Sequence, residues 1–288
     1  MTKKPKNPSI SLKIPRVILI ICKFFAFIST KLVTQFTAKL FTKPIKHKVP
    51  KRELEMDNKS IKNLIPIPTI NKSVMVYQYG RSDKKILLVH GWSGRGTQLF
   101  KIADAFVQEG YSTVSFDAPA HGKSPGSDSI MVDFIAAILE IDKKYGPFEA
   151  AVGHSLGGMS VMNAIKRGLK VNKAVIIGSG DIVQDIMDDF ILKLELEPII
   201  STKLRLHFEE KYGEKMDNYS VYKAAAEITT PVLVIHDKND IEVPVTAGIN
   251  IHKNLKNGEL LLTEGLGHRK ILGDYEVVKK TVQFSINK

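Results

Sequence analysis

Short apolar runs alternate with amphipathic stretches from residue 74 to the end of the chain. Several runs are continuous Val, Ile and Leu, which is typical of strands buried on both faces of a parallel sheet. The predicted strands are residues 74–79, 85–90, 112–117, 150–153, 174–177, 232–236 and 260–263. The predicted helices between them are residues 98–109, 130–145, 156–169, 245–255 and 274–286.

This alternation predicts an α/β fold with an open, mostly parallel, doubly wound sheet and helices on both faces, because right-handed crossovers place them there. The rhythm breaks after residue 178, and the next clear strand begins only near Pro231. Three stretches in the interval have helical apolar spacing, namely residues 181–194, 203–212 and 221–228. We therefore expect a helical cap inserted at residues 181–229 of a domain spanning 74–288, since a structureless loop of this length is uncommon.

The N-terminal region has a different pattern. Residues 14–41 are rich in apolar side chains, with Pro15 near the start of the stretch and Pro44 just after its end. Because proline is tolerated in a first helical turn and excluded from an interior, we expect one helix of roughly 40 Å between them. Its predicted apolar stripe is Ile18, Ile21, Phe25, Ile28, Leu32, Phe36 and Leu40, opposite Arg16, Lys23, Thr30, Thr34 and Thr37. Ile20 and Phe27 intrude on the polar side.

The positive charge is concentrated in the same region. The chain of 288 residues has a formal net charge of +12, yet residues 1–52 hold 13 Lys and Arg and no acidic residue. The remainder is almost neutral, which argues against a nucleic-acid-binding body. We therefore interpret residues 1–52 as a basic amphipathic arm and residues 53–73 as a linker.

An apolar stripe flanked by cations favours contact of residues 14–52 with an anionic membrane surface. Packing of the arm on its own domain is the alternative, and an export signal or anchor is another. The corresponding location is the cytoplasm, peripheral at the inner membrane surface, with an exported or anchored protein as the alternative.

Composition excludes several classes of protein. With 43% apolar and 25% charged residues, the chain is neither disordered nor collagen-like, and no apolar run is long enough for a polytopic membrane protein. The single cysteine, Cys22, excludes an intramolecular disulfide.

The strongest chemical signal is the sequence Gly153-His154-Ser155-Leu156-Gly157, which follows a predicted strand and opens a predicted helix. Two glycines permit a tight, strained turn that exposes the serine hydroxyl, and the helix N-terminus points positive potential toward it. A serine nucleophile needs a base that a carboxylate orients. Asp240 and His268 each follow a predicted strand, so we expect both at the same edge of the sheet as Ser155.

These motifs together resemble the α/β-hydrolase family over residues 74–288. His90-Gly91-Trp92 is similar to its oxyanion loop, residues 116–124 to its second conserved loop, residues 153–157 to its nucleophile elbow, residues 231–244 to its acid loop, and Gly267-His268 to its histidine loop. The resemblance implies Ser155 as nucleophile, His268 as general base and acid, and Asp240 as the orienting carboxylate. It implies the backbone N–H groups of Trp92 and Leu156 as the oxyanion hole.

Rival residues are present near each candidate. Asp237 is the nearest competitor of Asp240, but the family's spacing to Val243-Pro244 favours Asp240. Asp117 and His121 are interpreted as loop-bracing residues, and His154 and His236 as buried neighbours of the site. No metal-ligand spacing and no nucleotide-binding fingerprint is present, so we expect no metal and no cofactor.

The sequence therefore predicts a serine hydrolase, of carboxylesterase or lipase type, acting on a small ester or thioester. An acyltransferase or peptidase using the same three residues is an alternative, because these reactions share the acyl-enzyme. A non-catalytic ligand-binding member of the fold, or a membrane adaptor acting through its arm, are alternatives from other classes.

Overall fold

The computed structural model describes residues 14–287, and an eight-stranded sheet forms its centre. The strands are β1 (Ile61–Ile67), β2 (Lys72–Tyr79), β3 (Lys85–Val89), β4 (Ser112–Asp117), β5 (Ala150–His154), β6 (Lys173–Ile177), β7 (Val232–Asp237) and β8 (Gly258–Thr263). They are arranged in the order β1-β2-β4-β3-β5-β6-β7-β8. Strands β3 to β8 pair in parallel, whereas β2 is antiparallel to both of its neighbours. The predicted mostly parallel sheet is confirmed.

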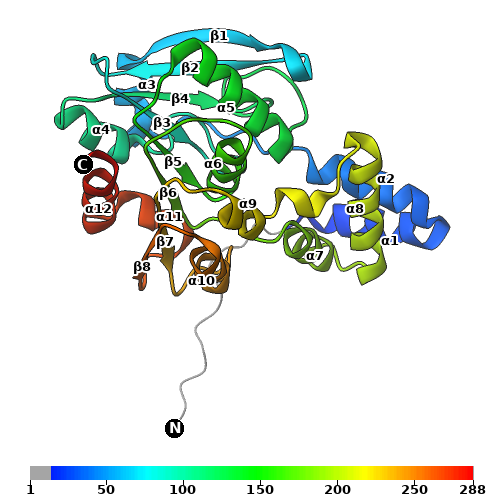
Figure 1. Ribbon diagram of the computed structural model, residues 1–288. Helices are drawn as coiled ribbons and strands as arrows, with labels where there is room; N and C mark the ends of the chain where they lie inside the picture. The colour runs from blue at the N-terminus through cyan, green and yellow to red at the C-terminus, as the bar shows by residue number, and fades with distance from the viewer. Residues whose placement is uncertain (1–13, 288) are drawn as a thin grey trace.

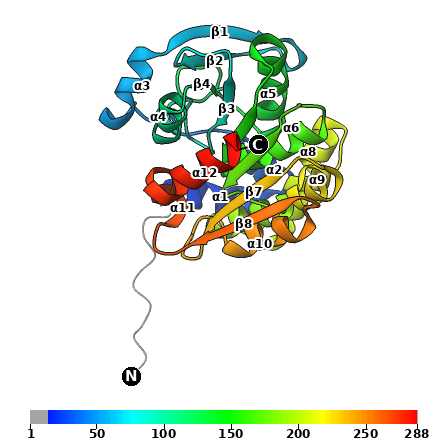
Figure 2. The same ribbon diagram turned by 60° about the vertical axis from the view of Figure 1, so that its left-hand side comes forward.

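Helices cover both faces of this sheet (Figure 1). Helices α4 (Phe100–Gln108) and α12 (Tyr275–Ile286) cover one face, and Figure 2 shows α12 in front of the central strands. Helices α5 (Met131–Tyr145), α6 (Leu156–Lys166) and α10 (Val245–Asn254) cover the other. Alternate residues of one strand reach the two layers, since Leu88 belongs to the first and Leu87 to the second. The period-two geometry of a strand thus explains why these runs are apolar throughout.

Residues 53–73 differ from the expected linker. They form the short helix α3 (Leu54–Lys59) and the edge strand β1, which pairs along its whole length with β2. On β1 only Ile65 and Ile67 are buried, and Pro66 lies between them. An edge strand tolerates proline because one side of its backbone needs no partner. The weak alternation and the proline together hid this strand from the sequence pattern.

The cap interval is helical, as predicted. It contains α7 (Val183–Lys193), α8 (Pro198–Tyr212), the short 3-10 helix η3 (Met216–Tyr219) and α9 (Val221–Glu227). Helix α8 begins at Pro198, ahead of the predicted start at residue 203, because proline fits the first turn of a helix. Figure 1 shows α7 and α8 grouped with the N-terminal helices to one side of the sheet.

The prediction of a single long N-terminal helix is wrong. Two helices are present, α1 (Arg16–Ile28) and α2 (Thr30–Phe41), and the chain is extended at Ser29, where φ is −163° and ψ is 131°. The Ser29 hydroxyl accepts a hydrogen bond from the backbone N–H of Lys31 and thereby caps α2. Serine is favoured at a helix N-cap for this reason. Ser29, which lies inside the predicted helix, is therefore the residue at which α1 ends and before which α2 begins.

The expected division of the arm into an apolar and a polar face also needs correction. Thr34 and Thr37 are buried, because their hydroxyls donate to the helix carbonyls of Thr30 and Thr34 and need no other partner. The ring of Phe41 packs against Phe190 of α7 and Phe208 of α8, with ring centroids 5.1 and 5.7 Å away. The arm therefore packs on the cap of its own chain. Within residues 14–287, none of the helices combines the length and the apolar character needed to cross a bilayer.

Candidate active site

Ser155 occupies a sharp turn between β5 and α6. Its backbone has φ 52° and ψ −122°, a conformation that non-glycine residues rarely adopt. A Cβ on Gly157 would lie 2.3 Å from the carbonyl oxygen of Val89, and one on Gly153 would lie 2.5 Å from that of Gly157. Both glycines are therefore needed for the close approach of α6 to β3 and β5. The surrounding structure holds the serine in a strained turn, which is the local geometry that the motif predicts.

The turn leaves Ser155 and Leu156 accessible while the flanking residues are buried. Residues 151–154 and 157–164 are buried, whereas Ser155 and Leu156 are half-buried. Leu156 is the first residue of α6, and its backbone N–H has no hydrogen-bond partner among the described residues. A free N–H at a helix N-terminus attracts negative charge. The hydroxyl and one prospective oxyanion donor thus lie on adjacent residues.

The structure joins His268 to Asp240. Nδ1 of His268 lies 2.7 Å from Oδ2 of Asp240, and both side chains are buried. The other carboxylate oxygen accepts the backbone N–H groups of Glu242 and Val243 at 2.8 and 2.9 Å. Burial opposes ionisation of Asp240, but the bonds from His268 and from these two N–H groups outweigh it and lower the pKa of the carboxyl. An ionised Asp240 fixes the ring with its Nδ1 protonated and its Nε2 available as a base.

Gly178 connects Ser155 to the His268–Asp240 pair. The backbone N–H of Ser155 donates to Ile177, the residue before Gly178, at 2.9 Å. A Cβ on Gly178 would lie 3.3 Å from Nδ1 of His268 and 3.5 Å from Oδ2 of Asp240. The three predicted residues therefore converge at one edge of the sheet. Among the described residues, the Ser155 hydroxyl makes no hydrogen bond, so the bond between serine and histidine stays a prediction.

The loop after β3 supplies the other prospective oxyanion donor. A Cβ on Gly91 would lie 2.9 Å from that of Ser155, which places Gly91 and Trp92 beside the nucleophile turn. The backbone N–H of Trp92 has no hydrogen-bond partner within residues 14–287. The indole of Trp92 meets the ring of His121 edge-on, with centroids 5.1 Å apart. This contact fixes the loop after β3 against the loop after β4.

Sequence reasoning missed the residues that hold the loop after β3 in place. Oε2 of Glu53 accepts hydrogen bonds from Arg95 at 2.9 Å and from Thr97 at 2.8 Å, and its side chain is almost wholly buried. The backbone N–H of Ile45 donates to the hydroxyl of Ser93 at 3.0 Å. The segment after α2 thus braces the prospective oxyanion loop. The only feature of the sequence that pointed to this role was Glu53 itself, the first acidic residue of the chain.

The rival aspartates are occupied by fixed donors. Asp237 accepts from the Thr263 hydroxyl at 2.8 Å and from the backbone N–H groups of Leu266 and Asn239 at 3.0 and 2.9 Å. Asp117 accepts from the backbone N–H groups of Gly96 and Lys123 and from Tyr77. Among the residues that the structure describes, neither carboxylate is hydrogen-bonded to a histidine. Both aspartates brace loops.

Four further histidines surround the site, and all are buried. Burial lowers the pKa of His121 to about 4 and that of His154 to about 3, and it lowers the pKa of His90 and His236 as well. Each uses one ring nitrogen on a backbone carbonyl, as His154 does by donating from Nε2 to the carbonyl of His268 at 2.9 Å. Of the histidines described here, only His268 pairs with a carboxylate at ordinary hydrogen-bond distance.

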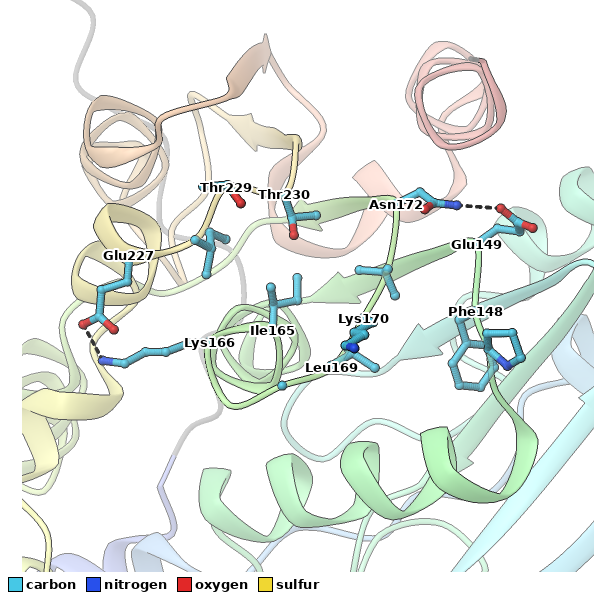
Figure 3. Close-up of a pocket in the computed structure, with 14 residues that line it drawn as sticks. Phe148, Glu149, Ile165, Lys166, Leu169, Lys170, Asn172, Glu227, Thr229 and Thr230 are labelled. Atoms are coloured by element: carbon cyan, nitrogen blue, oxygen red, sulfur yellow. Dashed lines mark hydrogen bonds and ion pairs between the residues drawn. The ribbon is translucent and has the colours of Figure 1, made fainter.

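Other features are remote from this chemistry. Among residues 14–287, no group of His, Cys, Asp and Glu side chains is placed to hold a metal ion. A groove with a volume of about 730 Å³ lies at the amino ends of β5, β6 and β7, the opposite edge of the sheet from Ser155 (Figure 3). Within it Lys166 pairs with Glu227 at 2.8 Å, and Glu149 accepts a hydrogen bond from Asn172 at 2.7 Å. We assign it no part in the site.

Comparison with known proteins identifies the family. A model of the α/β-hydrolase family matches residues 86–227, and a model described as TAP-like protein matches residues 214–284. Together with the sheet order and the serine turn, these matches show that the chain belongs to the α/β-hydrolase family. No curated protein sequence matches the chain.

Solved structures show the same fold at low sequence identity. An esterase from Exiguobacterium antarcticum has a TM-score of 0.62 and 16% identity, covering 79% of this chain and all of its own. A putative lipase from Acinetobacter baumannii AYE has a TM-score of 0.62 and 17% identity, covering 83% of this chain and 96% of its own. A bromoperoxidase from Bacillus anthracis has a TM-score of 0.61 and 15% identity, covering 79% of this chain and all of its own.

Proposed function

We propose that this chain is a serine hydrolase that cleaves a small carboxylic ester or thioester through an acyl-enzyme on Ser155. One observation supports the proposal: a half-buried serine in a strained turn lies at the same edge of the sheet as a histidine that is hydrogen-bonded to a buried aspartate whose pKa is lowered. The esterases and the putative lipase among the structural neighbours agree with this activity.

In the acylation step, the hydroxyl oxygen of Ser155 attacks the carbonyl carbon of the ester while Nε2 of His268 accepts the hydroxyl proton. Asp240 stays ionised and stabilises the imidazolium that forms. The tetrahedral intermediate carries its negative charge on the former carbonyl oxygen. Its collapse breaks the bond to the alcohol or thiol, which leaves with the proton from His268.

Water completes the reaction. His268 accepts a proton from a water molecule, which attacks the acyl carbon, and Ser155 then leaves with that proton as the free hydroxyl. The N–H groups of Trp92 and Leu156 would donate to the oxyanion in both steps. Loss of one such donor typically costs about 3 kcal/mol of transition-state stabilisation.

A serine-directed fluorophosphonate tests the nucleophile. We expect it to label the wild-type chain, and we expect Ser155→Ala to abolish both labelling and ester hydrolysis with an unchanged circular dichroism spectrum. Ser82→Ala is the matched control, because Ser82 lies before β3 at the opposite edge of the sheet. Labelling that persists in folded Ser155→Ala would exclude Ser155 as the nucleophile.

A panel of acyl donors and acceptors tests the type of reaction. The purified chain is given short esters, thioesters and amides, with water alone or with an added alcohol as acyl acceptor. We expect release of free acid from esters or thioesters. Preferential transfer to the added alcohol would favour an acyltransferase, and preferential amide cleavage would favour a peptidase.

A further inference from the structure

The outward face of α1 carries large apolar side chains that are more than half exposed in the described part of the chain. The exposed fractions are 60% for Val17, 66% for Ile20, 58% for Phe24, 91% for Phe27 and 52% for Ile28. Their spacing places them on one side of the helix. Single exposed apolar residues are ordinary, but a contiguous patch marks an interaction surface.

The exposure of this face does not result from incomplete packing of the arm, because the opposite side of α1 is packed. Phe25 turns inward and meets Phe36 of α2 edge-on at 5.2 Å, and Cys22 of the same helix is fully buried. The neighbouring Phe24 and Phe27 turn outward instead. Helix α1 therefore has two apolar sides, of which one is used against its own chain. The two residues that spoil the predicted polar side, Ile20 and Phe27, lie on the exposed one.

The charge around this face indicates what covers it. Residues 1–52 hold 13 Lys and Arg and no Asp or Glu. Arg16 begins α1, Lys31 follows its end, and both are exposed. Lys23 is exposed on α1 and pairs with Glu195 of the cap. A second protein would need a matching acidic rim, whereas a second copy of this chain would bring the same positive charge and be repelled.

We propose that the outward face of α1 docks on an anionic lipid surface, with the aromatic side chains in the acyl boundary and the surrounding cations at the headgroups. Burial of apolar area and attraction to anionic lipid add in such a helix. The docked helix lies in the plane of the interface and does not span it. The proposal is independent of the hydrolase chemistry, because none of its residues belongs to the candidate active site.

Vesicle co-sedimentation of the full chain tests this surface. We expect binding to vesicles of phosphatidylcholine mixed with phosphatidylglycerol, and at least about tenfold weaker binding to phosphatidylcholine alone. Raising the salt from about 0.1 M to about 1 M shortens the Debye length from about 10 Å to about 3 Å, so binding should weaken. Equal binding to both kinds of vesicle would overturn the anionic character of the site.

Two double variants separate this face from general surface hydrophobicity. Phe24→Ser/Phe27→Ser should weaken binding at least about tenfold, since burial of one Phe contributes about a power of ten to partitioning. Leu64→Ser/Tyr275→Ser is the matched control, because Leu64 on β1 and Tyr275 on α12 are 55% and 73% exposed and lie outside the arm. The control should bind as the wild type does. Thermal unfolding of both variants shows whether either has lost its fold.

Two results would overturn the proposal. The first is a folded Phe24→Ser/Phe27→Ser variant that binds anionic vesicles as tightly as the wild type does. The second is a wild-type chain that binds no vesicles but forms a dimer in analytical ultracentrifugation, which the same variant converts to a monomer. That second result would assign the face to a copy of this chain.

Discussion

Two groups of loops at the carboxyl edge of the sheet are built from the same kinds of side chain and differ in what they leave free. In the loops after β7 and β8, Asp240 uses one oxygen on backbone N–H groups and the other on the ring of His268. Around the loops after β3 and β4, Glu53 of the N-terminal segment and Asp117 at the end of β4 accept only from donors that do not titrate near neutral pH.

This difference separates a carboxylate that could take part in proton transfer from carboxylates that hold loops in place. A buried carboxylate is costly unless it is fully hydrogen-bonded, so every such group in this protein has partners. Of these carboxylates, only the one paired with a histidine could assist proton transfer from a serine hydroxyl through the ring, because the ring has a second nitrogen that exchanges a proton. Burial alone therefore does not distinguish the two kinds of carboxylate. The hydrogen-bond partner of each carboxylate distinguishes them.

Among the tests of this comparison, we expect the largest effect on kcat, when Asp240 and Asp237 are replaced in turn. In a serine triad, replacing the orienting aspartate with asparagine lowers kcat about 10⁴-fold, because the histidine takes the wrong tautomer. We expect Asp240→Asn to show a loss of this size in steady-state ester hydrolysis. Asp237→Asn, three residues earlier, should lose about tenfold or less and mainly lower the free energy of unfolding, by about 1–3 kcal/mol. Equal losses of kcat would mean that the two aspartates share one role.

The next effect is on stability. Glu53→Ala leaves the largely covered Arg95 without its partner, and breaking a buried ion pair in this way costs about 3–5 kcal/mol of the free energy of unfolding. We expect urea unfolding to show that loss, and kcat of the folded fraction to fall by less than for Asp240→Asn.

Glu53→Gln is the matched variant for this test. It keeps an acceptor for Arg95 or Thr97, so it should recover part of the stability and part of kcat. A Glu53→Ala chain as stable and as active as the wild type would show that the loop after β3 holds its place without the N-terminal segment.

The smallest effect is on the pH dependence of stability, where the two groups should have opposite signs. The pKa of Asp240 is lowered, so its contribution is present above the ordinary aspartate pKa of about 4 and is lost as the pH falls through the folded value. Burial raises the pKa of Asp117, with its hydrogen bonds offsetting part of the effect. Stability should therefore increase as the pH falls through the raised pKa of Asp117.

Chemical unfolding of wild type, Asp240→Asn and Asp117→Asn between pH 3 and 7, a range that brackets the ordinary aspartate pKa of about 4, measures both slopes. The stability gap between wild type and Asp240→Asn should narrow toward low pH. The gap between wild type and Asp117→Asn should change in the other direction. Slopes of the same sign for the two variants would contradict the distinction between the two groups of loops.

The central sheet and the serine turn were predictable because their signals are local. A strand buried on both faces needs an uninterrupted apolar run, and the turn at Ser155 needs glycine at 153 and 157 within five residues of chain. The edge strand β1 was not predictable, since only Ile65 and Ile67 are buried and Pro66 separates them. Helix α1 ended at Ser29 because a serine N-cap competes locally with continuation of the helix.

The sequence by itself determined the order of β2 to β8 along the chain, the strained serine and the carboxyl-edge positions of Asp240 and His268, because each depends on sterics or periodicity over a few residues. The tertiary structure alone decided that Glu53 pairs with Arg95, 42 residues away, and which side of α1 faces outward. Periodicity defines the sides of a helix, but the surface it packs against selects the one that is buried. For α1 that surface is α2, where Phe36 meets Phe25, and α2 is itself held through Phe41 by residues of α7 and α8 more than 140 positions further along the chain.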